Sequence, residues 1–119
     1  MFDLLEKTHE KVLATKISGK LTEQDYKEMF PLVEETVEKY GKICLYVELE
    51  NFEGWDSPKS FWDEFKISFK HYTDLEKVAI VGEKKWEEYA TKASNFLNPA
   101  TIRYFSEDQK EEAYNWIEE

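Results

Sequence analysis

The feature that most constrains the fold of this chain is the alternation of short apolar runs with longer segments of helical spacing. The runs at residues 12–17, 42–48, 78–82 and 101–105 are separated by segments in which apolar side chains recur every three or four positions. Strands that alternate with helices favour a mainly parallel sheet with right-handed crossovers. A further run at residues 2–5 is separated from the next by a polar turn, which predicts an initial antiparallel hairpin.

The expected fold is therefore α/β, with a five-stranded mixed sheet and helices packed around it. The predicted order is β-β-α-β-α-β-α-β-α, and it fills one domain over residues 1–119. Thr22 and the capping box Ser106-x-x-Gln109 mark two helix starts, and Gly41 marks a helix end. Pro31 lies inside the first helical pattern, where we expect it to kink the helix or split off its first turn.

The charge of the chain disfavours several classes of partner. Its 26 acidic and 16 basic residues give a formal net charge of −10. This charge repels nucleic acid, and it disfavours an electrostatic hold on anionic lipid headgroups. There is no apolar stretch long enough for a transmembrane helix, and the N-terminus lacks a secretory signal pattern. The single cysteine, Cys44, lies in an apolar run and is expected to be a core residue in a reducing compartment, so we expect a cytoplasmic protein.

No pattern in the sequence predicts a catalytic or metal centre. Neither His9 nor His71 has the spacing to other histidines or cysteines that a metal site requires. No nucleophile–base set or paired acid and base is visible, so the sequence disfavours an enzyme and implies no cofactor.

The aromatic residues offer the clearest candidate for a binding site. The segment Phe52-Glu53-Gly54-Trp55 follows a predicted strand and is expected to form a loop, while another tryptophan follows the next strand. Ligands bind beyond the carboxyl ends of parallel strands in open α/β sheets. The rings either fold over the core or form the wall of a site for an apolar ligand or protein partner. The predicted site residues are Phe52, Trp55, Trp62 and Trp86. Acidic neighbours favour a neutral or cationic ligand, or a basic partner surface.

Several short motifs, in order along the whole chain, resemble those of the SpoIIAA-like family. That family is a distant branch of the STAS domains, and it is also compared with CRAL-TRIO lipid-binding domains. The resemblance implies a small α/β domain with a mixed sheet, but no settled activity. The residues that carry it are Phe52-Glu53-Gly54-Trp55, Trp62-x-Glu64, Lys70-His71, residues 78–82 with Trp86, Phe96, Ile102-Arg103-Tyr104-Phe105 and Ala113-x-x-Trp116-Ile117.

A second resemblance concerns regulation. Anti-sigma-factor antagonists with the STAS fold carry Asp-Ser-Ser-Gly at a helix start, and the first serine is phosphorylated. Asp56 and Ser57 stand in that place here, but Pro58 and Lys59 replace the last two residues of the motif. Ser57 is therefore either an ordinary helix cap, which contributes about 1 kcal/mol, or a phosphorylation site.

These observations together predict a non-catalytic binding or regulatory module. Its ligand would be a small apolar molecule, a lipid or a protein partner. The alternative is a phospho-regulated partner-switch protein of the STAS type. Either function is compatible with a homo-oligomer.

Overall fold

The computed structural model describes residues 2–6, 8–55, 75–88, 90–91 and 101–119. For Tyr26, Gly54 and Trp55 it describes the backbone alone. The predicted helix start at Ser57, the predicted site residue Trp62, and His71 all lie outside the described residues.

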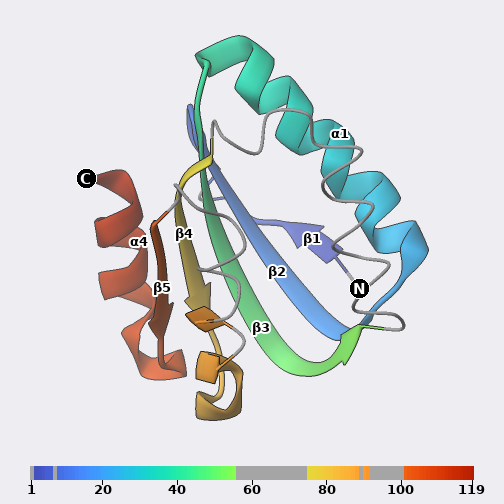
Figure 1. The fold of residues 1–119 in the computed structure, drawn as a ribbon, viewed down its shortest axis with the longest axis vertical. Coiled ribbons are helices and arrows are strands. Elements are labelled where there is room, and N and C mark those ends of the chain that lie inside the picture. The colour runs from blue at the N-terminus through green and yellow to red at the C-terminus, as the bar shows by residue number, and fades with distance from the viewer. Residues whose placement is uncertain (1, 7, 56–74, 89, 92–100) are drawn as a thin grey trace.

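The five strands form one sheet in the order β1-β2-β3-β4-β5. The first pair is antiparallel and every later pair is parallel, so the predicted five-stranded mixed sheet is confirmed. Figure 1 shows α1 (Glu23–Tyr40) on one side of this sheet and α4 (Lys110–Glu118) on the other. The strands are β1 (Phe2–Leu4), β2 (Val12–Leu21), β3 (Ile43–Trp55), β4 (Leu75–Val81) and β5 (Thr101–Phe105).

Helix α1 begins and ends where the sequence predicts. Thr22 forms a capping box with Asp25, and Gly41 closes the helix in the left-handed conformation with φ 81°. The helix runs through Pro31 as one element, so the predicted separation of its first turn is wrong. Pro31 itself is exposed, while Phe30 and Val33 on either side of it are buried against the sheet. That shared apolar face holds the helix together despite the backbone hydrogen bond lost at the proline.

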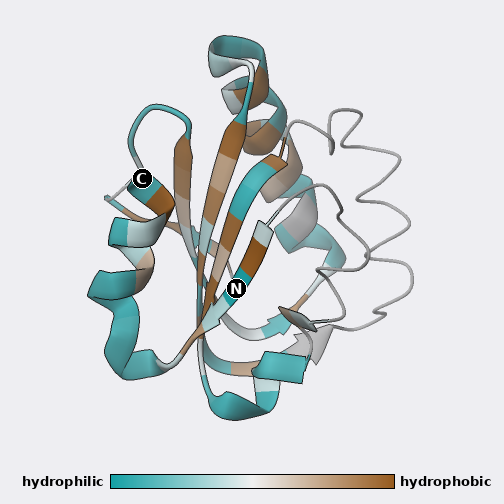
Figure 2. Ribbon diagram, turned by 60° about the vertical axis from the view of Figure 1, so that its left-hand side comes forward, coloured by the Kyte–Doolittle hydropathy of each residue, from teal (hydrophilic) through white to brown (hydrophobic). Residues whose placement is uncertain are grey.

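Two apolar layers enclose the sheet because successive side chains of a strand point to opposite faces. On β2, Leu13 and Ile17 belong to the layer on the α1 side, whereas Val12 and Ala14 belong to the layer on the α4 side. Cys44 is buried in the α4-side layer, which confirms its predicted place in the core. Figure 2 shows the hydrophobic residues concentrated along the central strands.

Strand β3 is longer than the sequence predicts. It continues to Trp55 and pairs with Gly19–Leu21 of β2, so the predicted loop at Phe52–Trp55 is wrong. Two register shifts explain the difference, because the pairing skips Asn51 and then Glu53 on β3. Asn51 adopts a positive φ of 49°, a conformation that asparagine tolerates better than most residues. The bulge at Asn51 places Phe52 in the same α1-side layer that Leu49 packs against.

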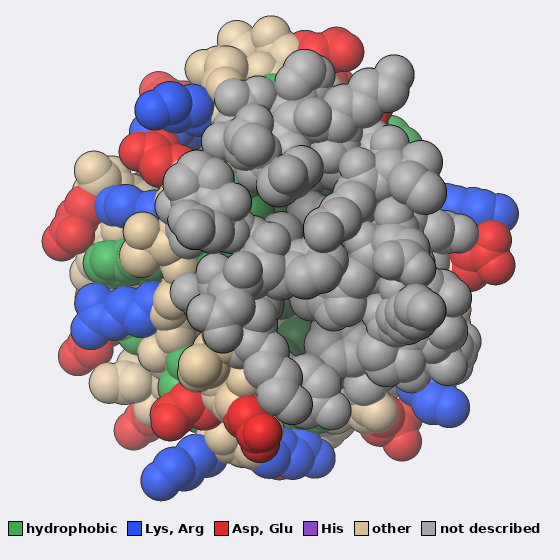
Figure 3. Space-filling model, viewed as in Figure 1, with side chains coloured by type: hydrophobic (Ala, Val, Ile, Leu, Met, Phe, Trp, Pro, Cys, Tyr) green, Lys and Arg blue, Asp and Glu red, His purple; other side chains and the backbone are tan. Residues whose placement is uncertain are grey.

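The exposed charges on the face seen in Figure 3 are not separated by sign. Acidic and basic side chains of the described residues alternate around its periphery. Among the described residues, no helix is long and apolar enough to cross a membrane. On this face the described residues form no large field of one charge that would mark a site. The candidate site is therefore sought in local geometry.

Candidate functional site

A polar cavity of about 220 Å³ lies on the sheet where β4 ends beside the middle of β3. The short helix η3 (Glu107–Gln109) and the start of α4 close its other side. Its lining is mostly charged or polar, with apolar contributions from a leucine and a valine. The lining residues are Glu48, Leu49, Glu50, Asn51, Val81, Glu107 and Lys110.

Glu48 is the central group of this cavity, and Tyr46 fixes its position. The two side chains lie on the same face of β3, and the Tyr46 hydroxyl donates a 2.7 Å hydrogen bond to Glu48 Oε1. Tyr46 is fully buried, and its ring meets the edge of Tyr114 with centroids 5.9 Å apart. Burial, together with the hydrogen bond to Glu48, raises the pKa of the Tyr46 hydroxyl far above its usual range. The hydroxyl therefore stays protonated and acts as a permanent donor.

The second oxygen of Glu48 is less well satisfied. Glu48 Oε2 lies 3.7 Å from Lys110 Nζ, which is beyond the usual range of an N–H···O hydrogen bond. The Glu48 side chain is only 12% exposed, whereas that of Lys110 is 51% exposed. A carboxylate offers about four acceptor positions. Among the described residues, Glu48 is thus a largely buried carboxylate with one short hydrogen bond and one distant cation.

A second lysine–glutamate pair lies beside the first. Lys16 on β2 contacts Glu50 on β3, and this hydrogen-bonded pair raises the pKa of Lys16 and lowers that of Glu50. Each lysine also interacts with the other carboxylate, because the charge of Glu48 acts on Lys16 and that of Lys110 acts on Glu50. Glu50 is more exposed than Glu48 and forms the outer part of the site.

Local contacts hold the elements around the cavity in place. Ser106 and Gln109 form the predicted capping box, which fixes the start of η3, and η3 leads directly into α4. Tyr104 on β5 donates a 2.8 Å hydrogen bond to the carbonyl oxygen of Gly82 at the end of β4. A Cβ atom at Gly82 would lie 3.1 Å from the Cβ of Leu49, so glycine permits the close approach of this backbone to β3.

Two of the four side chains of the predicted aromatic site, those of Phe52 and Trp86, are among the described residues. Phe52 and Trp86 do come together, with ring centroids 4.9 Å apart at an angle of 55°. Both are buried in the α1-side layer, at 3% and 8% exposure, on the opposite side of the sheet from Glu48. The side chain of Trp55 and all of Trp62 are outside the described residues. An aromatic pocket therefore stays a prediction, as does phosphorylation of Ser57.

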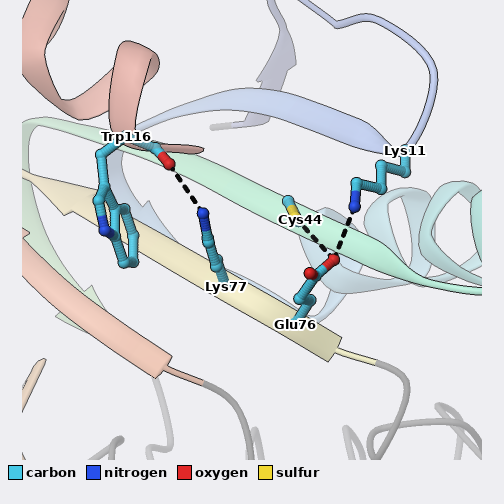
Figure 4. Close-up of polar contacts among 5 residues, drawn as sticks. All are labelled: Lys11, Cys44, Glu76, Lys77 and Trp116. Atoms are coloured by element: carbon cyan, nitrogen blue, oxygen red, sulfur yellow. Dashed lines mark hydrogen bonds and ion pairs between the residues drawn. The ribbon is translucent and has the colours of Figure 1, made fainter. Parts of the chain in front are cut away.

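A second cluster of polar side chains lies where β3 and β4 begin (Figure 4). Glu76 Oε2 accepts a 2.8 Å bond from Lys11 Nζ and lies 3.7 Å from Cys44 Sγ. Burial raises the pKa of Cys44, so its thiol is not activated as a nucleophile. Lys77 donates a 3.1 Å bond to the carbonyl oxygen of Trp116 and caps the end of α4. These contacts have a structural role.

Metal ligation finds little support in the described part of the chain. It contains no group of three or more His, Cys, Asp or Glu side chains arranged to hold a metal ion. His9 is exposed in the turn between β1 and β2, as predicted. The sequence-based prediction of a site did not include Glu48 and Lys110. One signal was available, since Tyr46-x-Glu48 places a phenol and a carboxylate on the same face of a buried strand.

Comparison with known proteins identifies the family. The family model described as SpoIIAA-like matches residues 12–118. The chain belongs to the SpoIIAA-like family. The SpoIIAA-like domain is similar to an uncharacterized DUF3478-family protein with a SpoIIAA-like fold from Shewanella loihica PV-4. The two are 32% identical, with a TM-score of 0.67, over 89% of this chain and 83% of that one.

A second solved structure shows the same fold at lower identity. It is the anti-sigma factor antagonist SpoIIAA in its unphosphorylated form, at 9% identity and a TM-score of 0.58. The match covers 97% of the SpoIIAA-like domain and 98% of that chain. No curated protein matches the chain. These findings confirm the predicted family and fold, whereas the CRAL-TRIO comparison and ligand binding stay predictions.

Proposed function

We propose that this SpoIIAA-like domain is a non-catalytic binding module that takes a basic side chain of a protein partner into the Glu48 cavity. The observation that carries the proposal is Glu48, a mostly buried carboxylate beside an open cavity, which accepts one short hydrogen bond from the described residues. A buried carboxylate that lacks donors is costly, and an incoming cation with N–H groups would supply them.

The charge of the lining supports a cationic guest. Three carboxylates, those of Glu48, Glu50 and Glu107, line the cavity with the amine of Lys110, and Lys16 pairs with Glu50 beside it, so these three carboxylates face two amines. The whole chain carries a net charge of −10, which attracts basic surfaces over distances near the Debye length. A phosphate or an anionic headgroup would meet repulsion from these carboxylates.

The size of the cavity supports a side chain rather than a lipid. Its volume is about 220 Å³, which is below the range of roughly 300–1,000 Å³ that is typical of small-molecule pockets. A polar lining also offers little apolar contact to an acyl chain. Of the ligands expected from the sequence, a protein partner therefore fits this cavity better than a lipid tail.

The name of one structural relative is consistent with a protein partner. SpoIIAA is an anti-sigma factor antagonist, and its fold matches almost the whole of this domain. A phospho-regulated partner switch at Ser57 would add regulation to such binding. It stays a prediction, because Ser57 lies outside the described residues.

The proposal is tested by titrating ¹⁵N-labelled domain with a capped Gly-Gly-Arg-Gly-Gly peptide and with the same peptide carrying citrulline. Citrulline keeps the shape of arginine but not its charge. We expect the arginine peptide alone to shift the amide signals of Leu49, Asn51 and Val81. Glu48→Gln should abolish these shifts, because the amide can still accept the Tyr46 bond but carries no charge.

The matched control is Glu35→Gln, which removes the same charge from an exposed position on α1. This variant should bind like the wild type. The proposal is wrong if both peptides shift the same signals equally, or if Glu48→Gln binds as well as Glu35→Gln.

A further inference from the structure

We propose that Lys110 is a built-in competitor for the cation position of the cavity. In the free domain its amine neutralises Glu48, and the basic side chain of the partner displaces it on binding. This inference rests on the proposed function. It adds that Lys110 occupies the cation position in the free domain, so that a weakly binding ligand does not displace it.

The two contacts of Glu48 differ in a way that suits such an exchange. The Tyr46 contact is short, at 2.7 Å, and comes from a fully buried residue. The Lys110 contact is long, at 3.7 Å, and comes from a side chain that is 51% exposed. Glu48 is thus held by its strand and by Tyr46, while the lysine can leave into solvent without disturbing the core.

The start of α4 does not depend on the lysine. The capping box between Ser106 and Gln109 supplies the local hydrogen bonds. Lys110 is the first residue of α4, near the positive end of the helix dipole, where a cation gains nothing from the helix. Its pairing with Glu48 is therefore the favourable interaction that holds its amine at the cavity, and losing it leaves the helix start intact.

An exchange of this kind makes the site selective. A cation that replaces Lys110 keeps Glu48 neutralised, and it can approach closely enough to form true hydrogen bonds. A neutral ligand would leave the carboxylate without the Lys110 amine once that lysine had moved away, and Lys16 is already hydrogen-bonded to Glu50. Competition from Lys110 also lowers the apparent affinity for the correct partner, since only the fraction of molecules with a vacated position can bind.

The experiment compares Lys110→Met with the matched variant Lys27→Met. Lys27 forms an exposed ion pair with Glu23 at 3.3 Å on α1, so both substitutions remove one lysine and break one lysine–glutamate pair. Because the Lys110–Glu48 contact is long and the lysine side chain is half exposed, this ion pair is weak, and we expect Lys110→Met to bind the arginine peptide about twofold to fivefold more tightly than the wild type. Lys27→Met should bind like the wild type.

A second measurement follows the lysine directly in the wild type. Saturation with the arginine peptide should move the Lys110 Cε–Hε signal toward that of a solvated lysine, and the citrulline peptide should not. Unchanged or weaker binding by Lys110→Met, an equal gain in Lys27→Met, or a Lys110 signal that does not respond to bound arginine peptide would each overturn the exchange. If neither the wild type nor Lys110→Met binds the arginine peptide, the cavity proposal itself fails.

Discussion

The hydrogen bond from Tyr46 to Glu48 gives the sharpest test of how the site is built. Tyr46→Phe removes one hydroxyl and keeps the buried ring and its contact with Tyr114. A hydrogen bond to a charged group contributes about 1.5–3 kcal/mol, and here its loss would deprive a carboxylate that is only 12% exposed of its short bond from Tyr46. We therefore expect Tyr46→Phe to lower the free energy of unfolding by about 1.5–3 kcal/mol.

Urea denaturation at pH 7 measures this loss. With a slope of roughly 1–3 kcal/mol per molar urea, the midpoint should fall by about 1 M while the slope stays the same. Tyr40→Phe is the matched control, because Tyr40 is 43% exposed and its hydroxyl can bond to water instead. That variant should unfold like the wild type.

The double-mutant cycle with Glu48→Gln isolates the role of the charge. In the Glu48→Gln background the phenol donates to a neutral amide, so Tyr46→Phe should cost only about 0.5–1.5 kcal/mol. Equal losses in both backgrounds would show that the hydroxyl does not serve a buried charge. A loss below about 0.5 kcal/mol in the wild type would refute the bond itself.

Two further predictions concern the remaining buried and paired groups. Trp86→Ala should cost about 3–5 kcal/mol in urea denaturation, and a cycle with Phe52→Ala should show a coupling of about 0.5–1.5 kcal/mol; a loss under about 1 kcal/mol would contradict the packing of this ring pair. The Lys11 bond lowers the pKa of Glu76, so the stability from that carboxylate is complete above its ordinary pKa of 4.5 and is lost as the pH falls through the lower value in the folded state. Glu76→Gln should therefore lose less stability than the wild type between pH 7 and pH 3, and an equal loss would contradict this role.

The elements that the sequence predicts correctly carry local signals. Thr22, Gly41 and Ser106 each act through neighbours within a few positions, and the structure shows the caps at all three. The strand order follows from the alternation of apolar runs, because each parallel strand requires a crossover. These features depend little on distant contacts, so a reading of the chain alone can find them.

The end of β3 could not be predicted in the same way. The simple alternating pattern holds through Leu49 and Glu50 and fails at Asn51, where a polar residue takes an apolar position. The strand continues because β2 offers pairing partners as far as Leu21 and because Asn51 accepts a left-handed backbone conformation. Neither cause produces a periodic pattern of apolar residues in the sequence. The segment containing Phe52 therefore resembles a loop until its pairing with β2 is known.

The Glu48 site depends on contacts between residues that are distant in sequence. Tyr46 and Glu48 share a strand face, but the lysine that neutralises the carboxylate comes from the start of α4. A carboxylate in this position costs desolvation free energy in the free domain, and Lys110 offsets that cost only from a distance of 3.7 Å. A partner cation that reached hydrogen-bonding distance would recover more of it. The feature that weakens the free domain is therefore the one that would strengthen its complex with a basic partner.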